Sequence, residues 1–212
     1  MIKIDKGKEP NSWTRHRLTP GARYEATDDL RNSLLSDQGY ICAYCMRRIP
    51  VSDKGCDETS RIEHVRPQSL LTEEQAMDYN NMVICCPGAI SSTADKSCHC
   101  DRHKKETEIS ISPFNQNQID TITYKGDGTI TSSDKNIEKD LNNTLNLNIP
   151  LLKANRKAVR DSLIMSFGKQ QLKKGDFEKI LKIYSSKDKE GRRKEYCGVV
   201  ISYINKKLRQ FQ

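Results

Sequence analysis

The chain has 212 residues and a net charge of +8, with 36 Lys and Arg against 28 Asp and Glu. This length suits one sizeable domain, or a small one with a helical extension. Only 35% of the residues are hydrophobic and no apolar run is long enough to cross a bilayer, so we expect a cytoplasmic protein with reduced thiols and no membrane contact. The positive charge favours a polyanionic partner but carries no base specificity.

The N-terminal part of the chain predicts an irregular arm followed by a helix. Residues 1–26 show no sustained hydrophobic period, and we expect Trp13 to pack on the domain. Residues 27–38 predict a helix with Thr27 as N-cap, two aspartates in the first turn, three leucines on one face and Gly39 as the stop. This helix would deliver the chain to its first cysteine pair.

Cysteines gather in the segment that follows. Cys42 and Cys45 form a C-x-x-C pair, the spacing with which two thiolates reach one tetrahedral zinc ion, and a second pair must complete the site. The candidates for completing it are Cys85, Cys86, Cys98 and Cys100, with His99 as a nitrogen ligand. We prefer Cys86 and Cys100, because Cys86 lies five residues after Asn81 and Cys100 opens the basic run C-D-R-H-K-K. Disulfides are the weaker alternative, because no secretory signal pattern is visible.

Short elements are predicted between and after these cysteines. M-R-R-I (46–49) and R-I-E-H (61–64) predict two strands, and the polar loop between them holds Cys56, which we expect to be a free thiol. A helical turn is expected from Thr72, and a helix over residues 101–107. The order strand, strand, helix around one metal is a ββα arrangement.

The C-terminal half changes character twice. Residues 113–135 alternate apolar and polar side chains around a Gly-rich turn, which predicts a β-hairpin. Residues 136–212 then predict three amphipathic helices, after Pro150, behind Asp176 and from Tyr196, which either fold back on the core or dock a partner. The expected fold is α+β, with these parts in chain order: an arm (1–26), a zinc-stapled core (27–112), a hairpin (113–135) and a helical region (136–212).

A smaller set of residues has the chemistry to cut a phosphodiester, which requires a base and a divalent cation. Neighbours on a strand point to opposite faces, so we expect different tasks for Glu63 and His64. His64 would be the base, at a loop mouth open to substrate, and Glu63 would help to hold the cation. Asn81 would contact the His64 ring and fix its tautomer, and Asp101 or His103 would complete the cation site. Taken singly, each residue also fits a surface pair, a turn or a solvated helix face.

The motifs C-x-x-C, E-H-x-x-P, N-M-V-I-x-C and C-D-x-x-K resemble those of the HNH endonuclease superfamily. I-E-H-V-R-P-Q-S, with an insertion before H-C-D, is similar more narrowly to the PtuB-like HNH proteins of retron and Septu anti-phage systems, and residues 145–158 extend the likeness. The resemblance implies His64 as the base, Asn81 as the middle asparagine and Glu63 as a metal-side carboxylate. Members mostly carry His or Asn directly after the last cysteine, where this chain has Asp101.

The resemblance also implies partners and cofactors. It predicts a zinc-stapled ββα-metal (HNH) nuclease core over residues 27–112, with a structural Zn²⁺ and a catalytic Mg²⁺ or Mn²⁺. It predicts DNA or RNA as substrate, a toxin-like effector role with a PtuA-like ABC-type ATPase, and a retron reverse transcriptase with its small DNA as a further partner. Residues 102–105 are expected to bind phosphate, because this basic run adjoins the metal site. The alternative is a non-catalytic zinc-dependent module that binds nucleic acid or protein; a Cys–His nucleophilic enzyme fits less well.

Overall fold

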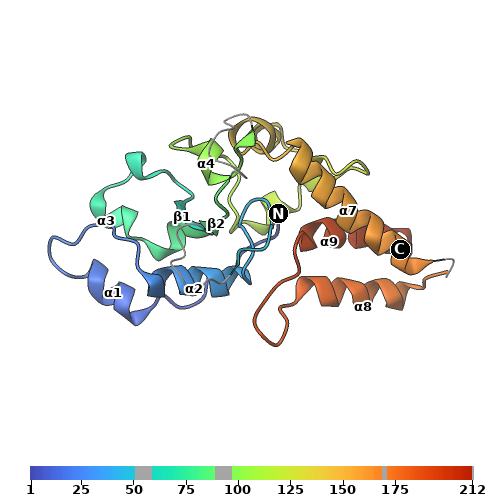
Figure 1. Ribbon diagram of the computed structural model, residues 1–212, viewed down its shortest axis with the longest axis horizontal. Helices are drawn as coiled ribbons and strands as arrows, with labels where there is room; N and C mark the ends of the chain where they lie inside the picture. The colour runs from blue at the N-terminus through green and yellow to red at the C-terminus, as the bar shows by residue number, and fades with distance from the viewer. Residues whose placement is uncertain (51–58, 89–96, 169–170, 212) are drawn as a thin grey trace.

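The computed structural model describes residues 1–50, 59–88, 97–168 and 171–211, which form an α+β architecture with two small antiparallel hairpins (Figure 1). Cys56 lies outside the described residues. None of the helices in the described part combines the length and the apolar character that a membrane span requires. The α-helices and β-strands in chain order are α1 (Asn11–Arg17), α2 (Asp28–Gln38), β1 (Arg61–His64), α3 (Glu73–Ala76), β2 (Met82–Cys85), α4 (Asp101–Lys104), α5 (Gln116–Ile119), β3 (Ile122–Tyr124), β4 (Ile130–Ser132), α6 (Lys135–Lys139), α7 (Pro150–Phe167), α8 (Lys174–Ser185) and α9 (Cys197–Leu208).

The N-terminal segment is more ordered than its composition predicts. The expected irregular arm contains the seven-residue helix α1, in which Trp13 is buried. The Trp13 Nε1 donates a hydrogen bond to the Met77 carbonyl oxygen at 3.1 Å, and the Ile4 backbone N–H donates to the Pro113 carbonyl oxygen at 2.8 Å. Contacts with distant segments therefore hold this arm on the core, since so short a helix is not stable by propensity alone.

The second helix, α2, confirms the predicted capping. The Thr27 side chain accepts a hydrogen bond from the Leu30 backbone N–H at 3.3 Å, and Gly39 ends the helix in a left-handed conformation with φ 66°. Leu30, Leu34 and Leu35 lie in the main core and are at most 1% exposed. The helix thus fixes the position at which the chain enters the C-x-x-C turn.

β1 and β2 form the hairpin at the centre of the N-terminal half. They pair antiparallel, with Arg61 opposite Cys85 and His64 opposite Met82. α4 follows the hairpin in the chain and lies beside it (Figure 1). This helix is one turn long and does not extend over the predicted residues 101–107, because the residue after it has a left-handed backbone conformation.

Of the two predicted strands, residues 61–64 form β1 as expected, but residues 46–49 do not form a strand. The turn around residues 46–49 contains an isolated bridge between Ile41 and Arg48. Met46 has φ 63°, so the chain curls at this point and cannot run extended beside β1. The buried segment Met82–Cys85 takes that place as β2. The order strand, strand, helix is as predicted, but the two strands are residues 61–64 and 82–85 rather than 46–49 and 61–64.

The β-hairpin predicted within residues 113–135 is present, but its strands lie in the later part of that range, and α5 (Gln116–Ile119) precedes them. β3 and β4 pair antiparallel, with Ile122 opposite Ser132. Gly128 in the connecting turn has φ 85°, and a Cβ there would lie 2.0 Å from the Lys153 carbonyl oxygen in α7. Glycine at this position therefore allows the hairpin to approach α7 closely.

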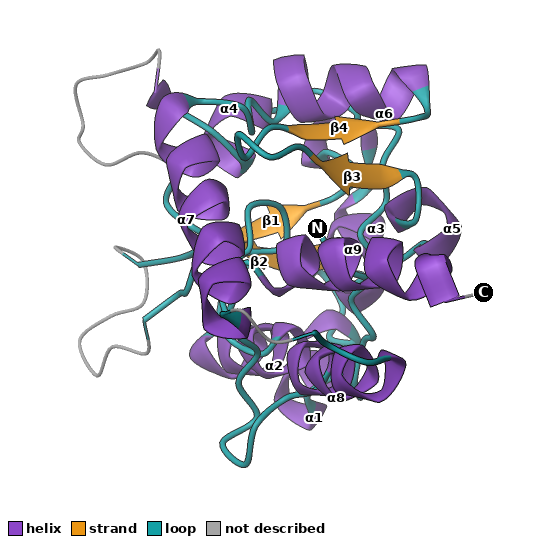
Figure 2. Cartoon of the chain, turned by 90° about the vertical axis from the view of Figure 1, so that its right-hand side faces the viewer, coloured by secondary structure: helices purple, strands orange, loops and turns teal. Residues whose placement is uncertain are grey.

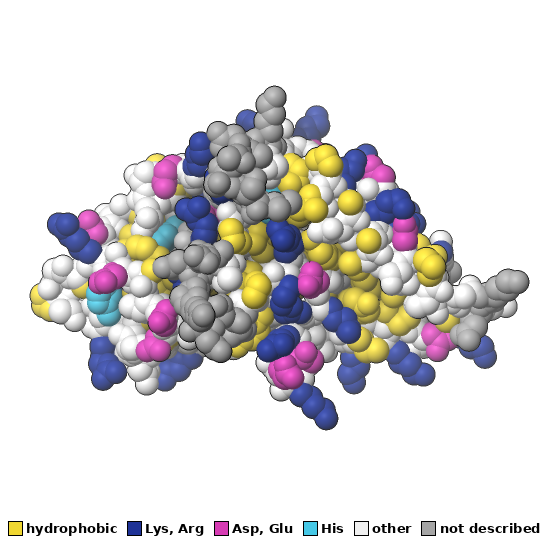
Figure 3. Space-filling model, viewed as in Figure 1, with side chains coloured by type: hydrophobic (Ala, Val, Ile, Leu, Met, Phe, Trp, Pro, Cys, Tyr) yellow, Lys and Arg dark blue, Asp and Glu magenta, His cyan; other side chains and the backbone are white. Residues whose placement is uncertain are grey.

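All three predicted C-terminal helices form, and they pack on the rest of the chain. The Tyr196 backbone N–H donates to the Met46 carbonyl oxygen at 3.1 Å, and the Arg48 guanidinium donates to the Arg193 carbonyl oxygen. Figure 2 shows α9 running below the β3–β4 hairpin, with the N-terminus between them. Apolar side chains are visible between α7 and α8 in Figure 3. A shared apolar cluster joins the three helices: Leu163, Phe177, Val200 and Ile204.

Gly198 in α9 tests whether this docking stabilises the fold. A Cβ at Gly198 would lie 2.6 Å from the Met1 carbonyl oxygen and 2.9 Å from the Met46 sulfur, whereas Gly175 in α8 has nothing within 4 Å of that position. We expect Gly198→Ala to lower the free energy of unfolding by about 1–3 kcal/mol through overpacking. Gly175→Ala should leave it unchanged or raise it by up to about 1 kcal/mol. Thermal denaturation measures both, and equal behaviour of the two variants would contradict tight docking of α9.

Candidate functional site

Four buried cysteines bring three segments of the chain together. Cys42 and Cys45 lie in the turn after α2, Cys86 directly follows β2 and Cys100 directly precedes α4. Their Sγ atoms all lie within 4.8 Å of one another, with 3.8 Å between Cys42 and Cys100 and 3.6 Å between Cys45 and Cys86. A tetrahedral zinc ion with Zn–S bonds of about 2.3 Å separates its sulfurs by about 3.8 Å. The cluster therefore has the geometry of a structural metal site such as zinc, and it consists of the four cysteines that we preferred.

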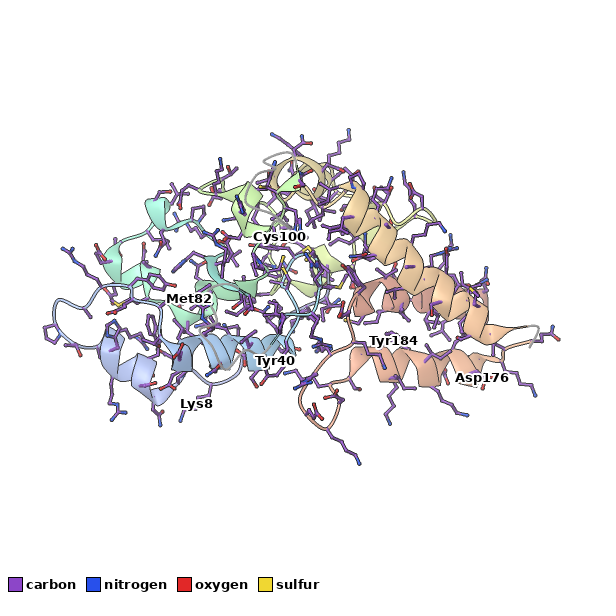
Figure 4. The ribbon with its side chains drawn as sticks, in the orientation of Figure 1. Lys8, Tyr40, Met82, Cys100, Asp176 and Tyr184 are labelled. Atoms are coloured by element: carbon purple, nitrogen blue, oxygen red, sulfur yellow. The ribbon has the colours of Figure 1, made fainter. Side chains whose placement is uncertain are left out.

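The backbone is shaped to present these thiols. The Met46 N–H donates to the Cys42 carbonyl oxygen at 3.0 Å and closes the C-x-x-C turn. On the other side of the cluster, the His99 N–H donates to the Gly88 carbonyl oxygen at 2.8 Å. Gly88 has φ 73°, and a Cβ there would lie 2.4 Å from the His99 carbonyl oxygen. Glycine thus lets the chain close on itself between Cys86 and Cys100; Cys100 lies near the middle of the molecule in Figure 4.

The other candidate ligands lie beside the cluster. Cys85 and Cys98 are buried but do not belong to the four-sulfur group. The His99 Nδ1 lies 3.1 Å from the Cys100 Sγ and 3.9 Å from the Cys86 Sγ, so a proton on Nδ1 would be donated to these sulfurs. In the described part of the chain, the His99 Nε2 is the single buried side-chain nitrogen or oxygen without a partner.

The strand β1 presents alternate side chains to α4. Arg61 and Glu63 are two residues apart and therefore share one face of the strand. The Arg61 Nε lies 2.7 Å from an Asp101 carboxylate oxygen, and the Lys104 Nζ lies 2.7 Å from the Glu63 Oε1. Asp101 and Lys104 are three residues apart and share one face of α4. Strand and helix are thus joined by two side-chain contacts, the Arg61–Asp101 ion pair and the buried hydrogen bond between Lys104 and Glu63.

The Glu63 carboxyl is the centre of this polar network. Its Oε1 accepts hydrogen bonds from the Lys104 ammonium and from the Tyr44 hydroxyl, the latter at 3.2 Å, and the carboxyl shares a hydrogen bond with Asp101. Burial and the neighbouring Asp101 carboxyl raise the pKa of Glu63 to about 8, although Lys104 acts in the opposite direction. At pH 7 Glu63 therefore retains a proton, which the hydrogen bond to Asp101 accommodates.

His64 points to the other face of β1 and is held as a neutral ring. Its Nε2 lies 2.8 Å from the Ala76 carbonyl oxygen, which can only accept, so Nε2 carries the hydrogen and Nδ1 keeps its lone pair. Burial, and then the charge of Lys104, lower the pKa of His64. We expected the ring to be open to solvent, and this prediction is wrong. His64 is 6% exposed, because Tyr24 lies edge-on against it with ring centroids 4.7 Å apart.

Asn81 does not contact the His64 ring. Its side chain accepts from the Arg66 N–H at 2.9 Å and donates to the Arg66 carbonyl oxygen at 3.0 Å, while its own carbonyl accepts from the Val65 N–H at 2.9 Å. The predicted hydrogen bond is therefore wrong, since the Ala76 carbonyl takes the place that we assigned to Asn81. Asn81 instead fixes the loop that follows His64.

His103 also lies elsewhere than predicted. Its Nδ1 is 3.0 Å from the Thr144 carbonyl oxygen. Two residues along a helix correspond to a rotation of about 200°, so His103 points away from Asp101 and does not join Glu63. Lys104, which we expected to bind phosphate with the basic run, is 1% exposed and bonded to Glu63. The carboxyl pair Glu63–Asp101 remains as the part of the predicted cation site that the structure brings together.

Several residues around Glu63 and His64 were not predicted at all. Tyr44 lies between the two cysteines of the C-x-x-C turn, and Tyr24 comes from the N-terminal arm, where no spacing or period marks it. The contact between Lys104 and Glu63 was also not predicted. A sequence signal for it exists, because Lys104 lies one helical turn after Asp101 and therefore shares its face of α4.

Comparison with known proteins adds no assignment. No protein-family model matches this chain, and no curated protein matches its sequence.

Adjacent cysteines provide a matched test of the metal site. We expect Cys86→Ala to lose bound zinc and to unfold at lower temperature, because one of four ligands is removed. Cys85→Ala removes an equally buried thiol outside the cluster, so it should keep one zinc ion per chain. Metal content by mass spectrometry, together with thermal denaturation, measures both. Loss of zinc from Cys85→Ala with retention in Cys86→Ala would contradict the assignment.

Proposed function

We propose that this protein is a metal-dependent endonuclease of the HNH type that hydrolyses phosphodiester bonds in nucleic acid. The motif resemblance suggests the class, and one geometric observation carries the proposal. On β1, a neutral imidazole with a free lone pair (His64) directly follows Glu63, whose carboxyl pairs with Asp101 at the start of α4, and a four-cysteine cluster holds strand and helix together.

The residues of the chain suit the two tasks of the reaction. The His64 Nδ1 accepts the proton of a water molecule whose oxygen attacks phosphorus, and the P–O bond to the leaving oxygen breaks. The Ala76 carbonyl holds the ring in the required tautomer. Glu63 and Asp101 are the residues to hold a divalent cation such as Mg²⁺ or Mn²⁺, which would stabilise negative charge on the phosphate and the leaving oxygen. Lys104 and Tyr44 orient the Glu63 carboxyl.

The cellular role that we propose rests on the resemblance to PtuB-like proteins. The protein would be the effector nuclease of an anti-phage defence system and would act with a PtuA-like ABC-type ATPase. In a retron context, a reverse transcriptase with its small DNA is the further partner. The substrate would be DNA or RNA. Because attack at the backbone phosphate does not itself read base sequence, any sequence preference would come from the partner.

A second candidate is a non-catalytic zinc-dependent module that binds nucleic acid or protein. The observation that favours it is the cover over His64, where Tyr24 leaves 6% of the residue exposed. In this case the network around Glu63 would serve stability alone. The two candidates differ in whether a divalent ion other than zinc has any effect.

Cleavage assays on histidine variants distinguish these candidates. We expect the wild-type protein with Mg²⁺ or Mn²⁺ to cut plasmid DNA or tRNA, alone or with its co-expressed ATPase. His64→Ala should lower the rate by about 10²-fold or more while it keeps zinc, because the base is removed and the cluster is not. His103→Gln should cut at the wild-type rate, because that ring faces Thr144. Undiminished cleavage by His64→Ala would falsify the assignment of the base.

The pKa of Glu63 gives a second test, by Mn²⁺ binding rather than cleavage. A cation at Glu63 and Asp101 must displace the proton that Glu63 holds below about pH 8. Affinity for Mn²⁺ should therefore rise with pH up to about 8, by up to about tenfold per pH unit, and then level off. Glu63→Gln should weaken binding and flatten the pH dependence. Titration calorimetry at several pH values measures this. If the Mn²⁺ affinity of Glu63→Gln still rose with pH as in the wild type, the displaced proton would belong to another group.

A further inference from the structure

A large cleft lies in the C-terminal half, apart from the site described above. Its walls are the N-terminal segment, the β3–β4 hairpin and α9, with contributions from α5, α7 and α8. Its volume is about 1390 Å³. Pockets that enclose small ligands measure roughly 300–1,000 Å³, so this space is large enough for a segment of a polymer. Neither the four cysteines nor the Glu63–His64 cluster lines it.

The charges around the cleft are strongly unbalanced. The cationic residues that line it are Lys3, Lys125, Arg160, Arg193, Lys206, Lys207 and Arg209, and the anionic residues are Asp5 and Asp120. Lys3 is paired with Asp5, and Arg160 with Asp161. Within the described chain, the other five cations form no ion pair. Lys206 and Lys207 stabilise the C-terminal end of α9, but the helix dipole does not account for Lys125 across the cleft.

An aromatic ring lies among these cations. Tyr203 on α9 lines the cleft and is half-buried. The Arg160 guanidinium lies 5.6 Å from the centre of its ring, and the Lys207 ammonium lies 5.8 Å from it. Cations that follow the phosphates, together with aromatic rings on which bases stack, are the combination with which proteins bind single-stranded nucleic acid.

We propose that this cleft binds a segment of single-stranded nucleic acid. The phosphates would lie along Lys125, Lys206, Lys207 and Arg209, and a base would stack against Tyr203. A duplex fits less well, because its bases are already stacked and an aromatic side chain in the cleft wall could not reach their faces. Binding here does not require that Glu63 and His64 cut, so this inference stands apart from the proposed nuclease activity.

Charge reversals with a matched control test the cleft. Fluorescence anisotropy would follow labelled oligo-dT and oligo-U of about 12 nucleotides, bound to the zinc-loaded full-length protein without added divalent ion. Lys206→Glu, Lys207→Glu and Arg209→Glu together should weaken binding at least about tenfold and reduce the salt dependence. The control combines Lys8→Glu, Lys179→Glu and Lys189→Glu, which change the net charge equally at exposed positions outside the cleft. We expect less than about a threefold loss from the control. The dT and U arms distinguish DNA from RNA as the preferred ligand.

Tyr203 supplies a test that leaves the charge unchanged. Tyr203→Phe keeps a ring for stacking and should bind as the wild type does, whereas Tyr203→Leu should bind about tenfold more weakly. Three results would overturn the proposal: no binding by the wild type, equal losses in the cleft and control triple variants, or full competition by polyglutamate at matched charge. The last result would assign the cleft to an acidic protein segment. None of these outcomes depends on nuclease activity, so the two proposals fail separately.

Discussion

The convergence of four thiols within 4.8 Å is the constraint on which the rest of the structure depends. It joins the turn after α2 to the end of β2 and the start of α4, so that Cys86, 41 positions after Cys45, and Cys100, 14 positions further on, meet at one point. With only 35% hydrophobic residues, the chain has limited apolar material for its core. A metal that binds only the folded cluster contributes its binding free energy to folding, so it would stabilise this centre beyond what apolar packing provides.

The cluster also determines where the polar network lies. Because Cys100 directly precedes α4, the cluster fixes the start of that helix, and the helix then places Asp101 and Lys104 against β1. Burial makes the network sensitive to charge: a lone buried carboxylate is costly, and Glu63 is compensated by Lys104, by Tyr44 and by a raised pKa of about 8. The alternation along β1 separates this carboxyl from the His64 imidazole on the opposite face. Two functional groups on adjacent residues thereby acquire different surroundings.

The C-terminal helices add a second structural unit to this centre. Tyr196, directly before α9, donates a backbone hydrogen bond to Met46, directly after the C-x-x-C pair, so the helical region is attached next to the cysteine cluster. The basic cleft is lined in part by α7, α8 and α9, and no residue of β1 or α4 lines it. Five of the cations that line it form no ion pair within the described chain, and they lie where the hairpin, the N-terminal segment and α9 meet. Under the two proposals, this cleft would hold a polymer while the site at Glu63 and His64 would cut it.

Sequence alone determined the features that depend on local chemistry. Thr27 and Gly39 bound α2 because caps act within one turn, and the β3–β4 hairpin follows from its Gly-rich turn. The four clustered cysteines were predicted from their spacing. Only the tertiary structure decided that β2 and not residues 46–49 pairs with β1, that Lys104 and not His103 meets Glu63, and that Tyr24 covers His64. These are contacts between distant segments, and they depend on which surfaces remain to be buried once the local elements have formed, a condition that no short stretch of sequence contains.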